Sequence, residues 1–306
     1  MVTRVESRLG LLLLSSIRRW LRRRVGAKVH RFKDSKGRTT PWLELGPSEG
    51  PILVWLHGFS DRPDGFLRTA GQLADRFRIV APAVPSFHEG WRDPDEIHTL
   101  SAYADWLEPV IRQAVKGHPY FLVGNSLGGA LSLELASRRP TNLRGLVAVN
   151  AAGIEVEGDT SIVDEFHRGD SPFNIQKREQ VGTLFRRILG RPVRIPFPFE
   201  AALYREYAQE AAWYMRLSAD ISNSEVKITE NGWRSAIDLS SVEVPALVLW
   251  GERDTLFPQS HAKKMAEALP HGRLEWMEGI GHSPHLEQPR RLARSIRGFV
   301  DSLPAA

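Results

Sequence analysis

Three side chains of the kinds that together activate a hydroxyl group follow one another along the chain: Ser126, Asp254 and His282. Ser126 lies in Gly124-Asn125-Ser126-Leu127-Gly128, where an apolar strand pattern runs directly into a helical pattern. In that context a G-x-S-x-G pattern places the serine on a sharp strand-to-helix turn, with its hydroxyl exposed above the sheet. A serine hydroxyl is a weak nucleophile at neutral pH and needs a base that a carboxylate orients. The sequence therefore predicts nucleophilic chemistry at Ser126.

The base and the carboxylate follow two later strand patterns. Residues 245–250 read as a buried strand, and the turn after them ends on Asp254. Residues 273–277 read as a second strand, and a glycine-rich loop after them carries His282. We expect His282 to act as general base and then acid, oriented by Asp254. Glu252 and Glu278 are alternatives for the acid, and His285, expected to face solvent or the pocket rim, is the alternative base.

A central strand pattern ends in His57-Gly58-Phe59. In folds with this serine turn, the oxyanion hole uses the backbone N–H of the residue after the nucleophile and one from a loop after an earlier strand. We expect these donors to be Leu127 and Phe59, each worth on the order of 3 kcal/mol of barrier. Substrate contacts are expected from both residues and from His57, Gly58 and Asn125, although a histidine after a strand is more often buried and structural.

With these motifs in order, the chain resembles an α/β-hydrolase of the lipase/esterase branch, similar to bacterial lipases and to hydrolases of the monoacylglycerol-lipase type. The matching segments, from about Pro51 onward, are His57-Gly58-Phe59-Ser60, Gly124-Asn125-Ser126-Leu127-Gly128-Gly129, Asn150-Ala151-Ala152-Gly153, Trp250-Gly251-Glu252-Arg253-Asp254, Gly279-Ile280-Gly281-His282 and Glu287-Gln288-Pro289. The resemblance implies an α/β-hydrolase fold and hydrolysis of carboxylic esters. It departs from the family pattern at Ala83 and Ser86, where relatives often carry aspartate and glycine, which bears on pocket shape.

Alternating strand and helix patterns predict a mostly parallel eight-stranded sheet flanked by helices, with an inserted helical cap. Strands are expected over 27–33, 41–45, 51–56, 77–81, 119–123, 144–149, 245–250 and 273–277, and helices over 64–75, 99–116, 127–138, 258–269 and 289–302. The alternation stops over 154–244, where helical patches at 177–189 and 200–219 indicate the cap. We therefore expect an amphipathic arm over 1–26, a hydrolase core over 27–153 and 245–306, and a cap over 154–244.

The positive charge of the chain is confined to its first residues. The net charge is +5, and residues 1–24 alone carry seven arginines and one glutamate, so the remainder carries −1. At helical spacing Val5, Leu9, Leu12, Leu13, Ile17 and Trp20 share one face of this arm, and Leu11 and Leu14 depart from it. The pattern favours a basic amphipathic helix on an anionic membrane surface. A core-packed or solvated helix and an organelle transit peptide are the alternatives.

Composition excludes several classes of site. The chain has no cysteine, so disulfides, a thiolate nucleophile and cysteine metal sites are excluded. The histidines show no metal-ligand spacing, so we expect neither a metal nor a cofactor. The near-neutral body gives no support for binding nucleic acid. We expect a cytoplasmic protein, held at a membrane surface if the arm binds lipid.

The sequence therefore favours a serine esterase or lipase acting on lipid-like or medium-chain acyl esters through an acyl-enzyme. A serine at the turn argues against haloalkane dehalogenases and epoxide hydrolases, whose relatives carry aspartate there. Three alternatives remain. The protein could be a thioesterase or a ligand receptor that retains the triad. It could also be a C–C bond hydrolase of the same superfamily, in which cap arginines such as Arg216 bind a charged substrate.

Overall fold

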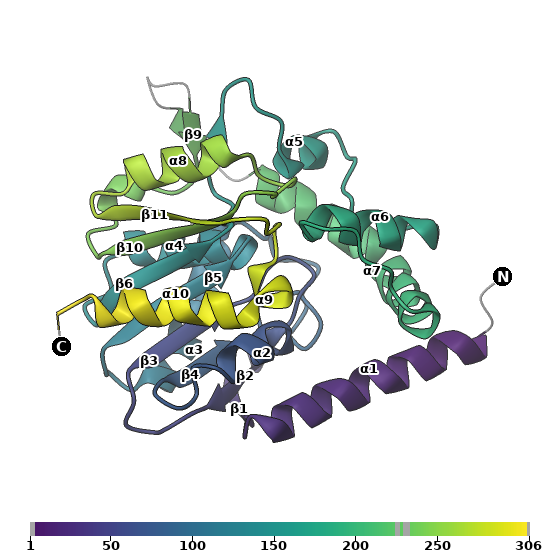
Figure 1. Ribbon diagram of the computed structural model, residues 1–306, viewed down its shortest axis with the longest axis horizontal. Helices are drawn as coiled ribbons and strands as arrows, with labels where there is room; N and C mark the ends of the chain where they lie inside the picture. Colours follow the sequence, from purple (N-terminus) through teal and green to yellow (C-terminus); the bar gives the residue numbers. More distant parts are fainter. Residues whose placement is uncertain (1–3, 224–226, 229–232, 305–306) are drawn as a thin grey trace.

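The main structural element of the protein is an eight-stranded sheet. A computed structural model describes residues 4–223, 227–228 and 233–304 (Figure 1). Its main sheet has the order β1-β2-β4-β3-β5-β6-β10-β11. The strands are β1 (Lys28–Lys33), β2 (Thr39–Leu45), β3 (Ile52–Leu56), β4 (Arg78–Pro82), β5 (Tyr120–Asn125), β6 (Leu143–Val149), β10 (Ala246–Gly251) and β11 (Gly272–Met277). β2 pairs antiparallel with β1 and β4, and all other pairs are parallel. The predicted mostly parallel eight-stranded sheet is confirmed.

Helices cover both faces of this sheet. They are α1 (Arg4–Arg24), α2 (Leu67–Ala70), α3 (Leu100–Val115), α4 (Leu127–Ser137), α5 (Ile162–His167), α6 (Glu179–Ile188), α7 (Phe197–Ser222), α8 (Gln259–Ala268), α9 (Pro284–Glu287) and α10 (Pro289–Asp301), with 3-10 turns at Pro63–Phe66 and Leu239–Ser241. α3, α4 and α8 pack on one face, and α2 and α10 pack on the other. The central strands are therefore buried on both sides, which explains their continuous apolar runs.

The prediction of a single helix over 64–75 is wrong. A 3-10 turn over Pro63–Phe66 and the one-turn α2 take its place, and turns follow α2. Gly65 and Gly71 lie within this stretch, and each disfavours a continuous helix by about 1 kcal/mol. The apolar residues of this stretch are buried by separate short turns that pack on the sheet. Their helical spacing therefore did not reveal that the helix is interrupted.

The residues between β6 and β10 form a layer of their own. α5, α6 and α7 lie together at one side of the sheet, beyond the ends of β5 and β6 (Figure 1). A small three-stranded sheet accompanies them, built from β7 (Glu155–Val156), β9 (Trp233–Ser235) and β8 (Lys227–Ile228) in that order. These short strands were not predicted from the sequence, because two or three residues are too few to establish an alternating pattern.

The amino-terminal helix α1 lies along the outside of the molecule with its amino end next to α7 (Figure 1). A side chain on Gly10 would overlap the carbonyl oxygen of Pro198 and the Cβ of Ala202, so the glycine allows the two helices to approach closely. Nearer the carboxyl end of α1, Arg22 forms a two-pronged ion pair with the buried Asp64, with N–O distances of 2.5 Å. One face of α1 is therefore docked on the protein.

The docked face explains the two leucines that departed from the amphipathic pattern. Leu11 and Leu14 lie on the half-buried side of α1 that carries Gly10 and Arg22. The apolar face formed by Leu9, Leu12, Leu13, Ile17 and Trp20 points away from the protein, and these side chains are 38% to 62% exposed. The helix thus has one face packed on the protein and an apolar face exposed to solvent.

We expect Gly10→Ala to destabilise the protein by about 1 to 3 kcal/mol, because the added methyl group must push α1 away from Pro198. Gly182→Ala is the matched control: Gly182 lies inside α6 in open space, so alanine there should stabilise by about 0.5 to 1 kcal/mol. Urea denaturation measures both differences. An unchanged or higher free energy of unfolding for Gly10→Ala would contradict the close packing of α1 on α7.

Candidate active site

The turn between β5 and α4 holds Ser126 in a strained backbone conformation. Its φ and ψ are 57° and −121°, a backbone conformation that residues other than glycine rarely adopt. The turn is fixed by its neighbours: the Ser126 N–H donates to Val149 O at 3.0 Å, and a Cβ on Gly128 would lie 2.0 Å from Leu56 O. Glycine at 128 is thus required for the helix to start this close to β3. The predicted strand-to-helix turn is present, with Ser126 on the wall of a cavity.

The structure brings His282 and Asp254 together from loops after β11 and β10. His282 Nδ1 donates to Asp254 Oδ2 at 2.8 Å, and the two side chains are 5% and 1% exposed. With Nδ1 donating, Nε2 is left as the basic nitrogen. His282 and Ser126 line the same cavity.

Three further N–H groups hold the Asp254 carboxylate. Oδ1 accepts from the backbone N–H groups of Leu256, at 2.8 Å, and Phe257, at 3.2 Å, while Oδ2 also accepts from Asn150 Nδ2 at 2.7 Å. No role was assigned to Asn150 from the sequence, and this contact was missed. Its place at the end of β6, beside β10 in the sheet, is the signal that identifies it.

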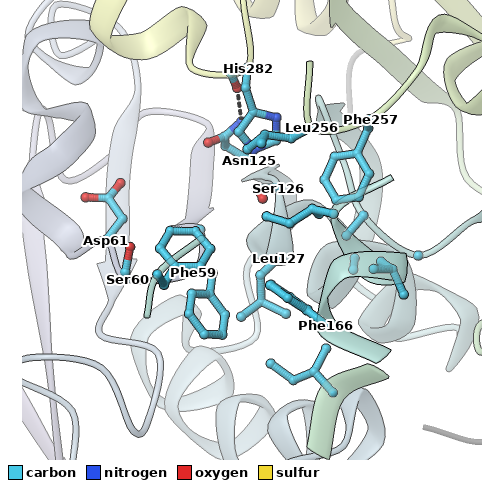
Figure 2. A pocket seen from close by; sticks show the side chains of 18 of the residues that line it. Phe59, Ser60, Asp61, Asn125, Ser126, Leu127, Phe166, Leu256, Phe257 and His282 are labelled. Carbon is cyan, nitrogen blue, oxygen red and sulfur yellow. Dashed lines mark hydrogen bonds between the residues drawn. The ribbon is translucent and has the colours of Figure 1, made fainter. Parts of the chain in front are cut away.

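The loop that carries His282 is tied to the serine turn and to the layer above it. Asn125 Nδ2 donates to the carbonyl oxygens of Val149 and His282, both at 3.1 Å, and Figure 2 marks the second of these bonds. Glu287 accepts from the backbone N–H groups of Gly281 and Gly190, each at 2.9 Å. Asn125 lines the cavity, but its amide is used to position the loop. Burial raises the pKa of the Glu287 carboxyl.

Both expected oxyanion donors lie beside Ser126. Leu127 begins α4, and Phe59 follows the His-Gly turn after β3. Neither backbone N–H has a hydrogen-bond partner among the described residues, so both are free to bind an oxygen of a ligand. The ring of Phe59 packs against Phe173 and Phe87, with centroids 4.6 and 5.0 Å apart, which fixes the loop that presents its N–H.

His57 supports this loop and does not line the cavity in the described structure. It is buried, its Nε2 accepts from the Val84 N–H at 2.9 Å, and its Nδ1 donates to Gly58 O at 3.0 Å. Burial lowers the pKa of the imidazole to about 3, so His57 is neutral. The expectation of a direct substrate contact at His57 is not supported by this placement, whereas Gly58, Phe59, Asn125 and Leu127 do line the cavity.

The cavity around Ser126 is mostly apolar. Phe166, Phe173 and Phe185 of the expected cap contribute to its wall, together with Tyr207, which the sequence did not single out. Other apolar residues of the lining are Leu100, Ala130, Ala152, Ile154, Ile162, Val163, Ile188, Ile221, Ala236, Leu256, Phe257 and Leu286. Figure 2 shows Phe166, Leu127 and Phe257 gathered on one side of the serine hydroxyl.

A polar group of residues lies on the other side. Figure 2 places Ser60 and Asp61 beyond Phe59, away from Phe257 and Phe166. Ser60 Oγ and Tyr207 OH are 3.2 Å apart. Burial raises the pKa of the Asp61 carboxyl to about 6, although 31% of the side chain stays exposed.

His285 does not face solvent. It is 4% exposed, lines the cavity, and its Nε2 lies 3.6 Å from Asp61 Oδ2. Burial lowers its pKa to about 3, so the ring is too weak a base to take the serine proton near neutral pH. The alternative acids Glu252 and Glu278 are exposed and lie outside the cavity lining.

Two remaining expectations concern metals and the cap arginine. Among the described residues no group of histidine and carboxylate side chains is arranged to hold a metal ion. Arg216 donates to the carbonyl oxygens of Pro94 and Glu96 and does not line the cavity. The charged-substrate role considered for Arg216 therefore has no geometric basis.

Comparison with known proteins identifies the family of this chain. The model of the alpha/beta hydrolase family matches residues 53–295. The chain belongs to the alpha/beta hydrolase family. Similar proteins include Lipase 1 of Psychrobacter immobilis, 25% identical over 86% of this chain and 81% of the lipase, and monoacylglycerol lipase ABHD6 of Mus musculus, 24% identical over 84% and 77%.

Solved structures confirm the fold of this hydrolase. A membrane phospholipase A, described as a bacterial virulence factor, superimposes with a TM-score of 0.87 at 24% identity, covering 97% of this chain and 93% of the other. A lipase from Acinetobacter baumannii AYE superimposes with a TM-score of 0.83 at 22% identity, covering 94% and 95%. The predicted α/β-hydrolase fold is confirmed.

Because the pKa of Asp61 is raised in the folded protein, its ionisation makes the free energy of unfolding depend on pH. The pKa is about 6 in the folded protein against 3.8 for the free side chain, so ionisation opposes folding above pH 6. This cost disappears as the pH falls from about 6 toward 4. We expect Asp61→Asn to raise the free energy of unfolding by about 1 to 2 kcal/mol at a pH of about 8, discounted for exposure, and to change little at a pH of about 4.

Paired denaturation curves of wild type and Asp61→Asn at the two pH values measure this difference. The comparison is internal, since every other titrating group is common to both proteins. Equal stability of the two proteins at the higher pH, or a larger difference at the lower pH, would contradict the assignment.

Proposed function

We propose that this hydrolase is a serine carboxylic ester hydrolase that works through an acyl-enzyme, with Ser126 as nucleophile, His282 as base and Asp254 as orienting acid. The observation that carries the proposal is the His282–Asp254 hydrogen bond of 2.8 Å beside a serine in a strained turn. The family match and the lipases and monoacylglycerol lipases among its relatives support the same reaction.

The proposed reaction uses Ser126 and His282, which line the same cavity. Ser126 Oγ attacks the ester carbonyl carbon, and its proton passes to Nε2 of His282. The carbonyl oxygen becomes an oxyanion between the N–H groups of Phe59 and Leu127, which stabilise it by on the order of 3 kcal/mol each. His282 then returns the proton to the departing alcohol oxygen. Water enters, loses a proton to His282 and attacks the acyl carbonyl, which releases the acid and restores Ser126.

The apolar cavity indicates the kind of acyl group. Its wall on one side of Ser126 consists of aromatic and aliphatic side chains from the sheet ends and from α5, α6 and α7. Each methylene buried there is worth about 0.8 kcal/mol, so medium-length acyl chains gain affinity from it. We therefore propose lipid-like or medium-chain esters as substrates, in line with the lipases among its relatives.

Hydrolysis of p-nitrophenyl esters from acetyl to palmitoyl tests this function. We expect wild-type activity with an optimum at a medium chain length, and a loss of at least about 10³-fold in Ser126→Ala, because water alone is a poor substitute for the activated hydroxyl. Activity that survives in Ser126→Ala would assign the reaction elsewhere. No ester hydrolysis by folded wild type would favour the C–C bond hydrolase or receptor alternatives.

We also propose that the outer face of α1 binds an anionic membrane surface. Its five large apolar side chains, Leu9, Leu12, Leu13, Ile17 and Trp20, account for half of the large apolar residues that are exposed in the described structure. Four arginines on the same helix, Arg8, Arg19, Arg23 and Arg24, are exposed and form no ion pair with the described residues. Apolar side chains flanked by unpaired arginines match an interfacial helix. No helix in the described part of the chain is long and apolar enough to cross a bilayer.

Substitution of exposed residues tests this contact without removing the docked face of α1. We expect Leu12→Ser combined with Trp20→Ser to weaken binding to vesicles of phosphatidylglycerol and phosphatidylcholine by at least about tenfold, because two apolar side chains no longer leave water. Ile97→Ser is the control, since Ile97 is 66% exposed but lies outside α1. Vesicle sedimentation measures both. Equal binding by the double variant and wild type would rule out this face as the membrane contact.

A further inference from the structure

The charged groups of the cavity are unevenly distributed. Among the described residues that line it, the side chains that carry a full charge are Asp61, Glu155 and Arg234. Arg234 pairs with Glu155, with N–O distances of 2.5 and 2.6 Å, so these two charges cancel. Asp61 therefore gives the cavity a net negative charge, located at its polar end.

Among the described residues no lysine or arginine lies within ion-pair distance of Asp61. The side chain within 4 Å is His285, which is neutral because burial lowers its pKa to about 3. The neighbouring arginine, Arg62, hydrogen-bonds Glu206 of α7 and His88, so its charge is already matched. The Asp61 carboxylate thus keeps its charge and part of its surface available to a molecule in the cavity.

The two ends of the cavity suit different parts of an ester. The apolar end, with Phe166, Leu127 and Phe257, takes a hydrocarbon chain at no polar cost. The end with Ser60, Asp61 and Tyr207 presents two hydroxyls and a carboxylate, which would be costly to cover with hydrocarbon. Ser126 lies between the two ends in Figure 2. An ester bound across the serine therefore places its acyl chain at the first end and its alcohol part at the second.

We infer that Asp61 is a specificity-determining residue of the alcohol subsite, which selects uncharged polyol groups such as a glycerol moiety and disfavours alcohols that carry a phosphate. This inference rests on the proposed ester hydrolysis and adds the class of leaving group. A carboxylate accepts hydrogen bonds from glycerol hydroxyls, and such charge-assisted bonds are about twice as strong as neutral ones. A phosphate at the same place meets a like charge in a partly desolvated site.

A matched pair of substrates isolates this charge: 1-octanoylglycerol and 1-octanoylglycerol 3-phosphate differ only by the phosphate. Both are used as monomers, below the concentration at which they aggregate, so that attraction of anionic surfaces to α1 does not enter. Release of octanoic acid gives kcat/KM for each. We expect wild type to prefer the neutral ester, and Asp61→Asn to reduce this preference at least about tenfold, the size expected for like charges roughly 6 Å apart at an effective dielectric constant of about 20.

Glu49→Gln is the control for a general loss of negative charge. Glu49 is exposed and precedes β3 at the opposite end of the strands from Ser126. This variant should keep the wild-type preference. A preference for the phosphate ester in wild type, or an unchanged preference in Asp61→Asn, would overturn the inference.

A second measurement needs no variant. Ether analogues that resist hydrolysis, 1-O-octylglycerol and its 3-phosphate, are compared as competitive inhibitors of p-nitrophenyl octanoate hydrolysis by wild type. We expect the neutral ether to bind at least about tenfold more tightly. Equal or tighter binding of the phosphate would overturn the inference. Failure of wild type to hydrolyse p-nitrophenyl octanoate would instead contradict the proposed ester hydrolysis, so the two failures are distinguishable.

Discussion

The buried carboxylate of Asp254 is the constraint on which the arrangement of this site depends. It accepts four hydrogen bonds, from His282, from Asn150 and from the backbone N–H groups of Leu256 and Phe257. A carboxylate that is 1% exposed is stable only when its oxygens are matched in this way. The donors come from the ends of β6, β10 and β11, which are neighbours in the sheet. The sheet order therefore fixes the imidazole.

The same physical logic links the outer helix to the cavity. α1 docks on α7 through Gly10 and on the loop after β3 through the Arg22–Asp64 pair. α7 carries Tyr207, whose hydroxyl lies 3.2 Å from Ser60 Oγ at the polar end of the cavity. A continuous set of packed elements thus connects the exposed apolar face of α1 with the leaving-group end of the cavity. The helix that we propose to bind a lipid surface therefore packs on α7, which contributes to the wall that we propose to receive the alcohol part of the ester.

Local patterns made much of the site predictable. The serine turn, the acid turn and the histidine loop each follow a strand within a few residues, so their motifs carry their own structural context. Contacts between distant segments were not predictable. Asn150 meets Asp254 because β6 and β10 pair, and Asp61 meets His285 across more than two hundred residues. The exposure of the apolar face of α1 was likewise not predictable, because it depends on the packing of the opposite face against α7.

Covalent labelling by a fluorophosphonate, with the modified residue identified by mass spectrometry, tests whether Ser126 is the activated nucleophile. We expect one adduct per chain, on Ser126, because only an oriented base makes that hydroxyl reactive. We also expect Asp254→Asn, which leaves the shape intact but misorients the imidazole, to slow labelling by about 10³- to 10⁴-fold. Labelling at another residue, or an undiminished rate in Asp254→Asn, would show that Ser126 is not activated by the His282–Asp254 pair.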